Sequence, residues 1–491
     1  MNRTAALLLS CLALATLPAV AAEPPDITEG SAPVVAPGNT VVRVANPDAA
    51  TPGFPSPAPP AAPRDLGSGC LGSWQVSGGT PARDCRSDEL GPTTADLLWS
   101  GGRYSLIAWQ PITDGDKVFM VRQVAFPSPP PPPPFEDSPV VAMDLATGAE
   151  LWAVHLPYET GDWTAWIAAA HSGLVFASRS GNGASVSAKM YALSQEDGSV
   201  VWVSTDEVNA GPYDGVVLAP DGDLIVGNFT NLMRIDAEDG STVWNVPRVP
   251  SFCSVSGSCG GATFGDAVYV ANSVGGGHVI VRHDLATGAA QYESPVMPGF
   301  TLQNTPFVGP DGTVYLSRTQ NNPGTDYFYA FEDTGTALVE RWNVPAAWTT
   351  YTEFAVATDG SPFMFAPGYD LVRLDPATGA TVDSAGLFPE CTYGIRMAID
   401  GNGVFSFGNG AFPPDQGRLR VFDANLDPLW DTPVNNINIG GPVIGHGGAL
   451  VVCGISTDVR VYRPEPSTPV CMPFADGFES GDTSAWSTTV P

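Results

Sequence analysis

The sequence predicts an all-β protein, an eight-bladed β-propeller with four antiparallel strands in each blade. Two repeated signals give this prediction. The first places an acidic or polar residue four positions before a glycine and eight positions before an aromatic residue, as in Asp144, Gly148 and Trp152. The second is a glycine-containing turn before a β-rich run, such as Asp221 and Gly222. Both recur with a period of roughly 40 to 50 residues, which is typical of propellers and solenoids.

The first signal is interpreted as a β-hairpin. The Asp side chain can bond backbone amides of the turn, the Gly adopts a backbone conformation that is costly for other residues, and the Trp begins the next strand with a large packing surface. Further copies lie at Gly198 and Trp202 after Ser194, at Asp236, Gly240 and Trp244, at Asp284, Gly288 and Tyr292, at Gly335 and Trp342 after Glu332, at Asp375 and Gly379 with Asp383 in place of the aromatic residue, and at Asp423 and Trp430.

Two hairpins in each period make four strands, which is one propeller blade. The region 97–463 gives roughly 46 residues for each of eight blades and roughly 52 for each of seven, so eight blades fit the observed period better and seven remain the alternative. The last turn signal is followed by only one further strand, which ends near Tyr462. We therefore expect Leu97, Leu98 and Trp99 to supply the outer strand of the last blade and to close the ring at its N-terminal side.

The pattern A-x-D-x-x-T-G-x-x-x-W at residues 142–152 resembles the tryptophan-docking motif of β-propeller repeats of the pyrroloquinoline-quinone (PQQ) type. This superfamily includes the eight-bladed quinoprotein dehydrogenases and the outer-membrane assembly lipoprotein of the BamB type. The resemblance implies the propeller fold. It does not by itself decide between a catalytic and a binding function, because one fold can host many functions.

A quinoprotein dehydrogenase is expected to have two adjacent cysteines beneath the cofactor, an acidic base, and Glu, Asn and Asp ligands for calcium. This chain has eight cysteines and no adjacent pair. It also has no nucleophile elbow, Walker loop or His-Glu-x-x-His motif. We therefore assign no catalytic, cofactor-binding or metal-binding residue. The interpretation is a non-catalytic binding or assembly scaffold that needs no cofactor, and the alternative is a quinone-dependent periplasmic or secreted oxidoreductase with PQQ and calcium.

The chain divides into five segments by composition. Residues 1–22 read as a secretory signal peptide, with a charged start, an apolar run and small residues suited to cleavage. Residues 23–66 form a linker rich in Pro and Ala that cannot bury a core. Residues 67–96 are a cysteine-containing segment, and residues 97–463 are the propeller. Residues 464–491 form a tail that resembles a short C-terminal motif of secreted bacterial proteins.

The composition limits which classes of partner the protein can bind and in which cellular compartment it works. The formal net charge is -30, from 51 acidic and 21 basic residues, so no basic surface is available to neutralise the phosphates of a nucleic acid. No stretch of the mature chain reaches the roughly 20 apolar residues that a membrane crossing needs. We expect an exported monomer, either secreted, at the cell surface or in the periplasm, whose partner is a protein or a glycan of the cell envelope.

Export also favours disulfides. The two pairs that we expect are Cys253 with Cys259, which would close a Gly/Ser-rich loop, and Cys70 with Cys85, which would tie down the segment before the first blade. The pairing of Cys391, Cys453 and Cys471 stays open.

Overall fold

The computed structural model describes the propeller and a short hairpin before it. The described residues are 33–36, 40–43, 74–101, 110–121, 139–157, 162–181, 188–209, 215–228, 230–248, 260–298, 305–318, 326–347, 354–388, 395–409, 417–434, 441–453 and 459–463. The expected signal peptide, most of the linker and the C-terminal tail lie outside these residues. Cys70, Cys253 and Cys259 do as well, so both disulfides stay predictions.

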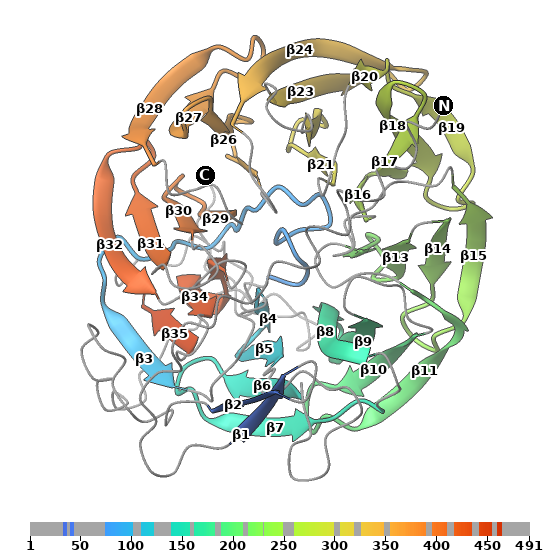
Figure 1. Ribbon diagram of the computed structural model, residues 1–491, viewed down its shortest axis with the longest axis vertical. Coiled ribbons are helices and arrows are strands. Elements are labelled where there is room, and N and C mark those ends of the chain that lie inside the picture. Colours follow the sequence, from blue (N-terminus) through green and yellow to red (C-terminus); the bar gives the residue numbers. More distant parts are fainter. Residues whose placement is uncertain are drawn as a thin grey trace, which may run out of the picture.

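Eight four-stranded antiparallel sheets form a ring, one sheet for each blade (Figure 1). This confirms the eight-bladed propeller, and the seven-bladed alternative is wrong. From the innermost to the outermost strand, blade 1 has β4 (Ile112–Asp114), β5 (Lys117–Val121), β6 (Val140–Asp144) and β7 (Glu150–Val154). Blade 2 has β8 (Asp162–His171), β9 (Leu174–Gly181), β10 (Lys189–Ser194) and β11 (Val200–Glu207). Blade 3 has β12 (Val216–Leu218), β13 (Leu224–Gly227), β14 (Asn231–Ile235) and β15 (Thr242–Pro247).

The next blades repeat this order. Blade 4 has β16 (Gly261–Phe264), β17 (Ala267–Val274), β18 (Gly277–Asp284) and β19 (Ala290–Glu293), and β20 (Met297–Pro298) also pairs with β18. Blade 5 has β21 (Phe307–Val308), β22 (Val314–Arg318), β23 (Asp326–Asp333) and β24 (Leu338–Ala346). Blade 6 has β25 (Ala355–Val356), β26 (Pro362–Ala366), β27 (Asp370–Leu374) and β28 (Thr381–Leu387). Blade 7 has β29 (Ile395–Ile399), β30 (Phe405–Asn409), β31 (Gly417–Phe422) and β32 (Pro428–Val434).

Blade 8 is built from both ends of the propeller sequence. Its inner strands are β33 (Val443–Ile444), β34 (Leu450–Cys453) and β35 (Val459–Tyr462), with the 3-10 helix η1 (His446–Gly448) between the first two. Its outermost strand is β3 (Leu97–Gly101), which pairs with β35. The pairing covers a sheet edge that would otherwise be open. A separate two-stranded sheet is formed by β1 (Pro33–Ala36) and β2 (Thr40–Arg43).

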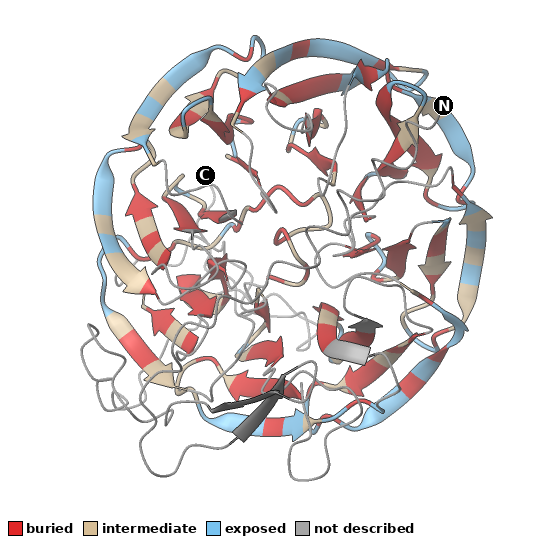
Figure 2. Ribbon diagram, viewed as in Figure 1, coloured by how far each residue is buried: buried red, intermediate tan, exposed pale blue. Residues whose placement is uncertain are grey.

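Burial follows the position of each strand in its blade (Figure 2). All four residues of β13 are buried, whereas no residue of the outer strand β15 is. The inner strands face neighbouring blades on both sides, and the outer strands face solvent on one side. The apolar runs of the sequence therefore become inner strands, and the alternating runs become outer strands. The described part of the chain holds no helix with the length and hydrophobicity that a membrane crossing needs.

The tryptophan of the repeat unit joins each blade to the next. In blade 2 the indole Nε1 of Trp202 donates a hydrogen bond of 2.9 Å to the carbonyl of Ala237 in blade 3. Its ring lies over Gly240, whose φ is +74° and where an added Cβ would be 2.5 Å from the ring. The same contact recurs for Trp99 with Leu145 (2.7 Å), Trp152 with Gln195 (3.1 Å), Trp244 with Leu285 (3.1 Å) and Trp342 with Pro376 (2.9 Å).

The acidic residue of the unit holds the turn that receives the tryptophan. In blade 1 an Asp144 carboxylate oxygen accepts hydrogen bonds from the backbone amide and the hydroxyl of Thr147, both at 2.7 Å. Asp284 and Asp375 bond Thr287 and Thr378 in the same way. These bonds lower the pKa of both carboxyl groups, because they stabilise the charged form.

Three junctions depart from this pattern. Trp430 donates to the carbonyl of Pro92, which precedes the propeller, because blade 8 has no repeat turn of its own. Blade 6 has Asp383 at the Trp position. In this blade Arg373, on the neighbouring strand β27, donates to the carbonyl of Ala424 in blade 7 (2.9 Å). In blade 4, Tyr292 takes the position of the docking tryptophan in the repeat, but its ring does not cover Gly335, since nothing lies within 4 Å of a Cβ added there.

We predict that Gly240→Ala destabilises the propeller more than Gly335→Ala does. Both glycines have a positive φ, +74° and +80°, so both changes carry a backbone cost of about 1 kcal/mol. Only the new methyl group at 240 meets a docked tryptophan, since nothing lies within 4 Å of a Cβ at 335. The overpacking should add about 2 kcal/mol. Urea denaturation of both variants measures the difference, and equal losses would contradict the docking role.

Candidate functional site

A segment that precedes the propeller in the sequence lies inside its ring. We call residues 74–92 the axial strap. It is the blue segment that crosses the interior of the ring before the chain reaches β3 (Figure 1). Its apolar side chains are buried, with Trp74, Val76 and Cys85 each at 0% exposure. The strap is therefore part of the propeller core, although composition alone places it in a separate segment, 67–96.

The strap bonds to the innermost strands of blades 1 to 7. Trp74 and Thr113 exchange two backbone hydrogen bonds of 3.0 Å, as neighbours in a sheet do. Five further backbone bonds follow the order of the chain, from Ala170 to Gln75, from Thr263 to Pro81, from Val308 to Ala82, from Val356 to Asp84 and from Ile399 to Cys85, at 2.8–2.9 Å. Blade 3 is reached by the side chain of Arg83, which donates to Val216 (2.6 Å). All of these partners belong to innermost strands, so the strap lies at the centre of the ring.

Arg83 fixes the strap by its side chain. It is 6% exposed and donates to the carbonyls of Gly261 (2.7 Å), Val216 (2.6 Å) and Ser77 (2.8 Å). A buried guanidinium group needs such acceptors, because an unsatisfied charge in the interior is costly. The bonds reach blades 3 and 4 as well as the strap itself, so one side chain connects three parts of the structure.

Asp400 holds the other end of the strap. It lies in the turn after β29, is 1% exposed, and accepts hydrogen bonds from the backbone amides of Gly91 (2.8 Å), Val404 (2.7 Å) and Asn402 (2.9 Å). Burial raises its pKa to about 6, because desolvation disfavours the carboxylate more than the amide bonds stabilise it. The strap thus ends on a carboxyl group that titrates well above the usual range for aspartate.

A pocket of about 410 Å³ opens between blades 4 and 5, where Tyr292 stands in place of the docking tryptophan. Three turns form it, after β16, β21 and β23. Its lining residues are Phe264, Gly265, Asp266, Tyr269, Arg282, Asp311, Gly312, Thr313, Glu332, Asp333, Gly335 and Arg341. The inner hairpins of both blades and the outer hairpin of blade 5 contribute these turns, so the shape of the pocket depends on how the two blades pack together.

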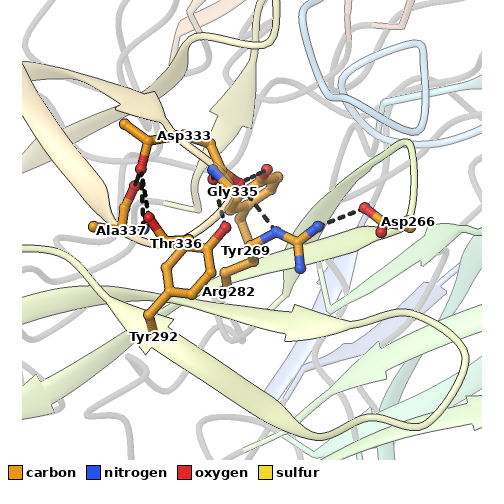
Figure 3. Close-up of polar contacts among 9 residues, drawn as sticks. Asp266, Tyr269, Arg282, Tyr292, Asp333, Gly335, Thr336 and Ala337 are labelled. Atoms are coloured by element: carbon orange, nitrogen blue, oxygen red, sulfur yellow. Dashed lines mark hydrogen bonds and ion pairs between the residues drawn. The ribbon is translucent and has the colours of Figure 1, made fainter.

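Asp333 is the centre of a polar cluster on one side of this pocket (Figure 3). Its carboxylate accepts hydrogen bonds from the hydroxyls of Tyr269 (2.6 Å) and Tyr292 (2.5 Å), and from Nε of Arg282 (3.0 Å). The backbone amide of Gly335 adds a fourth bond at 2.8 Å. Tyr292 therefore joins the two blades through its hydroxyl group, where other junctions use an indole.

The protonation states of this cluster are fixed near neutral pH. Burial acts to raise the pKa of Asp333, but the hydrogen bonds from the two tyrosines outweigh it and the pKa is lowered. Burial and the bond to Asp333 raise the pKa of Tyr292 to about 12, and the pKa of Tyr269 is raised for the same reasons. A carboxylate with four bonds and two neutral phenols can form a rigid wall of a binding pocket.

The chain lacks one feature expected of a quinoprotein site, because no two of its eight cysteines are adjacent. At the centre of the ring, Arg83 already donates three hydrogen bonds to carbonyls of this chain. Among the described residues, no group of three His, Cys, Asp or Glu side chains is placed to hold a metal ion. We therefore derive no chemical step through a quinone or through calcium.

The repeat residues named from the sequence lie at the blade junctions, and one of them, Gly335, also lines the pocket. The other lining residues and the strap were not identified from the sequence as parts of a site. Replacement of Trp by Tyr292 and the short turn at Gly335 are the signals that could have indicated the pocket. The strap gives a weaker signal, because Trp74 and Val76 show only one step of strand alternation.

We predict that Asp400→Asn changes the pH dependence of stability between about pH 4 and 6. The raised pKa means that the folded state binds the proton more tightly than the unfolded state, so the contribution of Asp400 to stability decreases as the pH rises through this window. Relative to the variant, the wild type should lose up to about 1.4 kcal/mol per pH unit. Denaturant unfolding at several pH values measures this.

Asp239→Asn is the control for this experiment. Hydrogen bonds from Ser241 lower the pKa of Asp239, so its contribution to stability is present at neutral pH and is lost on acidification. The difference between wild type and this variant should therefore change with the opposite sign. The same sign for both variants would contradict the assignment for Asp400.

Solved structures resemble this propeller at low sequence identity. A europium-containing methanol dehydrogenase is 14% identical, with a TM-score of 0.51 over 79% of this chain and 90% of the other. The quinohemoprotein alcohol dehydrogenase from Comamonas testosteroni is 13% identical, with a TM-score of 0.52 over 81% of each chain. BamB from Moraxella catarrhalis is 16% identical, with a TM-score of 0.45 over 67% of this chain and 92% of the other.

At these identities the solved structures show likeness of fold alone. A search of the curated proteins gives no match. One family model, described as outer membrane protein assembly factor BamB, matches residues 136–385, more than half of the 491 residues. The Asp, Gly and Trp positions that join blades 1 to 6 lie within the matched region. The chain therefore belongs to this family of PQQ-like β-propeller repeat proteins.

Proposed function

We propose that this protein is an exported β-propeller that acts as a binding or assembly scaffold in the cell envelope and has no catalytic activity of its own. The observation that carries the proposal is the axial strap. Its backbone bonds the innermost strands of six blades, and the side chain of Arg83 bonds that of blade 3, so the chain's own residues lie at the centre of the ring. A ligand that binds there would compete with bonds that the fold already uses.

The rest of the molecule suits a scaffold. Five tryptophan junctions hold the blades in fixed positions, and a rigid surface binds partners with little loss of conformational entropy. Exposed valines such as Val201 (54%) and Val382 (55%) lie on outer strands around the ring. A partner protein or glycan of the envelope would bind this outer surface or the turns, both of which are accessible without displacing the strap.

The quinone test decides between a scaffold and an oxidoreductase. We expect no saturable change in tryptophan fluorescence when the purified mature protein is titrated with PQQ to high micromolar concentration, with and without calcium. We also expect no turnover in a dye-coupled alcohol or sugar oxidation assay. A quinoprotein dehydrogenase assayed in parallel is the positive control. Saturable, calcium-dependent binding with turnover would make the oxidoreductase the better interpretation.

If the protein is exported, its signal peptide should be cleaved. The apolar run before Ala19 and the small residues Ala21 and Ala22 favour cleavage after residue 22. Mass spectrometry of the protein from envelope and secreted fractions should then find a mature chain that begins at Glu23. A full-length chain with Met1, found only in the cytosol, would contradict export and with it the place of the scaffold in the envelope.

A further inference from the structure

The pocket between blades 4 and 5 exists because this junction lacks the indole that closes its neighbours. At Gly240 and Gly288 the tryptophan of the preceding blade lies 2.5–2.6 Å from an added Cβ. At Gly335 and Gly265 nothing lies within 4 Å of such a Cβ. The space beside Gly335 is therefore open at the position where Gly240 and Gly288 each receive an indole.

The polar groups on the inner wall of the pocket already have hydrogen-bond partners within the protein. The side chain of Asp333 is 13% exposed and accepts four hydrogen bonds. The side chain of Arg282 is 10% exposed and forms ion pairs with both Asp333 and Asp266. These groups need no ligand to satisfy them. A ligand would instead meet the residues at the rim, which keep much of their surface open to solvent.

The rim has an excess of negative charge. The side chains of Asp266, Glu332 and Asp311 are 83%, 52% and 44% exposed. Arg341, which is 32% exposed, lies 3.5 Å from both Asp311 and Glu332. Together with Asp333 and Arg282, the lining has four carboxylates and two guanidinium groups. It therefore attracts a cation and repels an anion.

An aromatic ring completes the rim. Phe264 is 37% exposed, and its ring lies 3.3 Å from a Cβ added at Gly312, so it spans the junction from blade 4 to blade 5. A planar cation can stack on such a ring while it donates to nearby carboxylates in pairs. A guanidinium group meets both requirements, and the compact, strongly hydrated ammonium of lysine meets them less well.

We propose that this pocket binds an arginine side chain on the surface of a partner protein. The arginine would insert between blades 4 and 5, stack on Phe264 and donate to the carboxylates of Asp266 and Glu332. This inference rests on the scaffold function proposed above and deepens it, because it assigns the scaffold a recognition site and its partner a chemistry. The net charge of -30 also favours a basic partner surface.

The test is a ligand-observed NMR titration of the full mature protein with N-acetyl-arginine amide at low ionic strength. The neutral isostere N-acetyl-citrulline amide is titrated in parallel. We expect saturable binding of the arginine compound and none of the citrulline compound. In the double variant Asp266→Asn/Glu332→Gln, binding should weaken about tenfold, because the two exposed rim charges that would bond the guanidinium group are removed. Equal binding of both compounds, or no saturable binding to the wild type, would overturn the proposal.

A matched variant separates the pocket from general electrostatics. Glu196→Gln/Glu238→Gln also removes two negative charges, from exposed positions in the outer-hairpin turns of blades 2 and 3, which correspond to the turn of Glu332. Tryptophans close the junctions at both of these turns. It should bind the arginine compound as the wild type does. If both double variants lose affinity equally, the attraction is only that of an acidic protein, and the pocket assignment is wrong. Thermal denaturation checks that both variants are folded.

The two proposals fail in different ways. If PQQ binds with turnover, the scaffold function is overturned, while the NMR titration still reports whether the pocket binds a guanidinium group. If the arginine compound does not bind and PQQ does not bind either, only the pocket assignment is overturned.

Discussion

The contact between a tryptophan indole and the next blade's turn is the interaction on which the ring depends. It combines a hydrogen bond from Nε1 to a backbone carbonyl with packing of the ring against a glycine in a left-handed conformation. The aspartate holds the turn so that both the carbonyl and the glycine face the indole. Each part requires the others, which explains why the three residue types recur together at a fixed spacing.

Where this contact is replaced, the replacement gives each junction its own chemistry. Arg373 bonds the carbonyl of Ala424 without an aromatic ring, and Trp430 bonds Pro92 of the strap. At Tyr292 the hydroxyl group bonds Asp333, and the space beside Gly335 stays open. The site that we propose is thus a local departure from the repeat.

The sequence predicted the repeat and the blade number, because a fixed spacing of Asp, Gly and Trp follows directly from one local contact. It also identified Leu97 to Trp99 as a strand of the last blade, since the strand count left one position open. The strap could not be predicted in this way. Its bonds run through backbone groups of Pro81, Ala82 and Asp84, and backbone bonding leaves no pattern of side chains. The pocket was missed because Tyr292 is aromatic and was grouped with tryptophan, although its function depends on its hydroxyl.

The path of the axial strap has a consequence for folding. The strap is synthesised before every blade, yet its hydrogen-bond partners are spread from Thr113 to Trp430. Arg83 finds its acceptors outside the strap only when blades 3 and 4 exist, and the carbonyls of Cys85 and Glu89 bond amides of blade 7. Contacts of such sequence separation form late and slowly. The first residues of the ring are thus among the last to be ordered, and the propeller should reach its native state as one cooperative unit, with no stable intermediate made of the early blades alone.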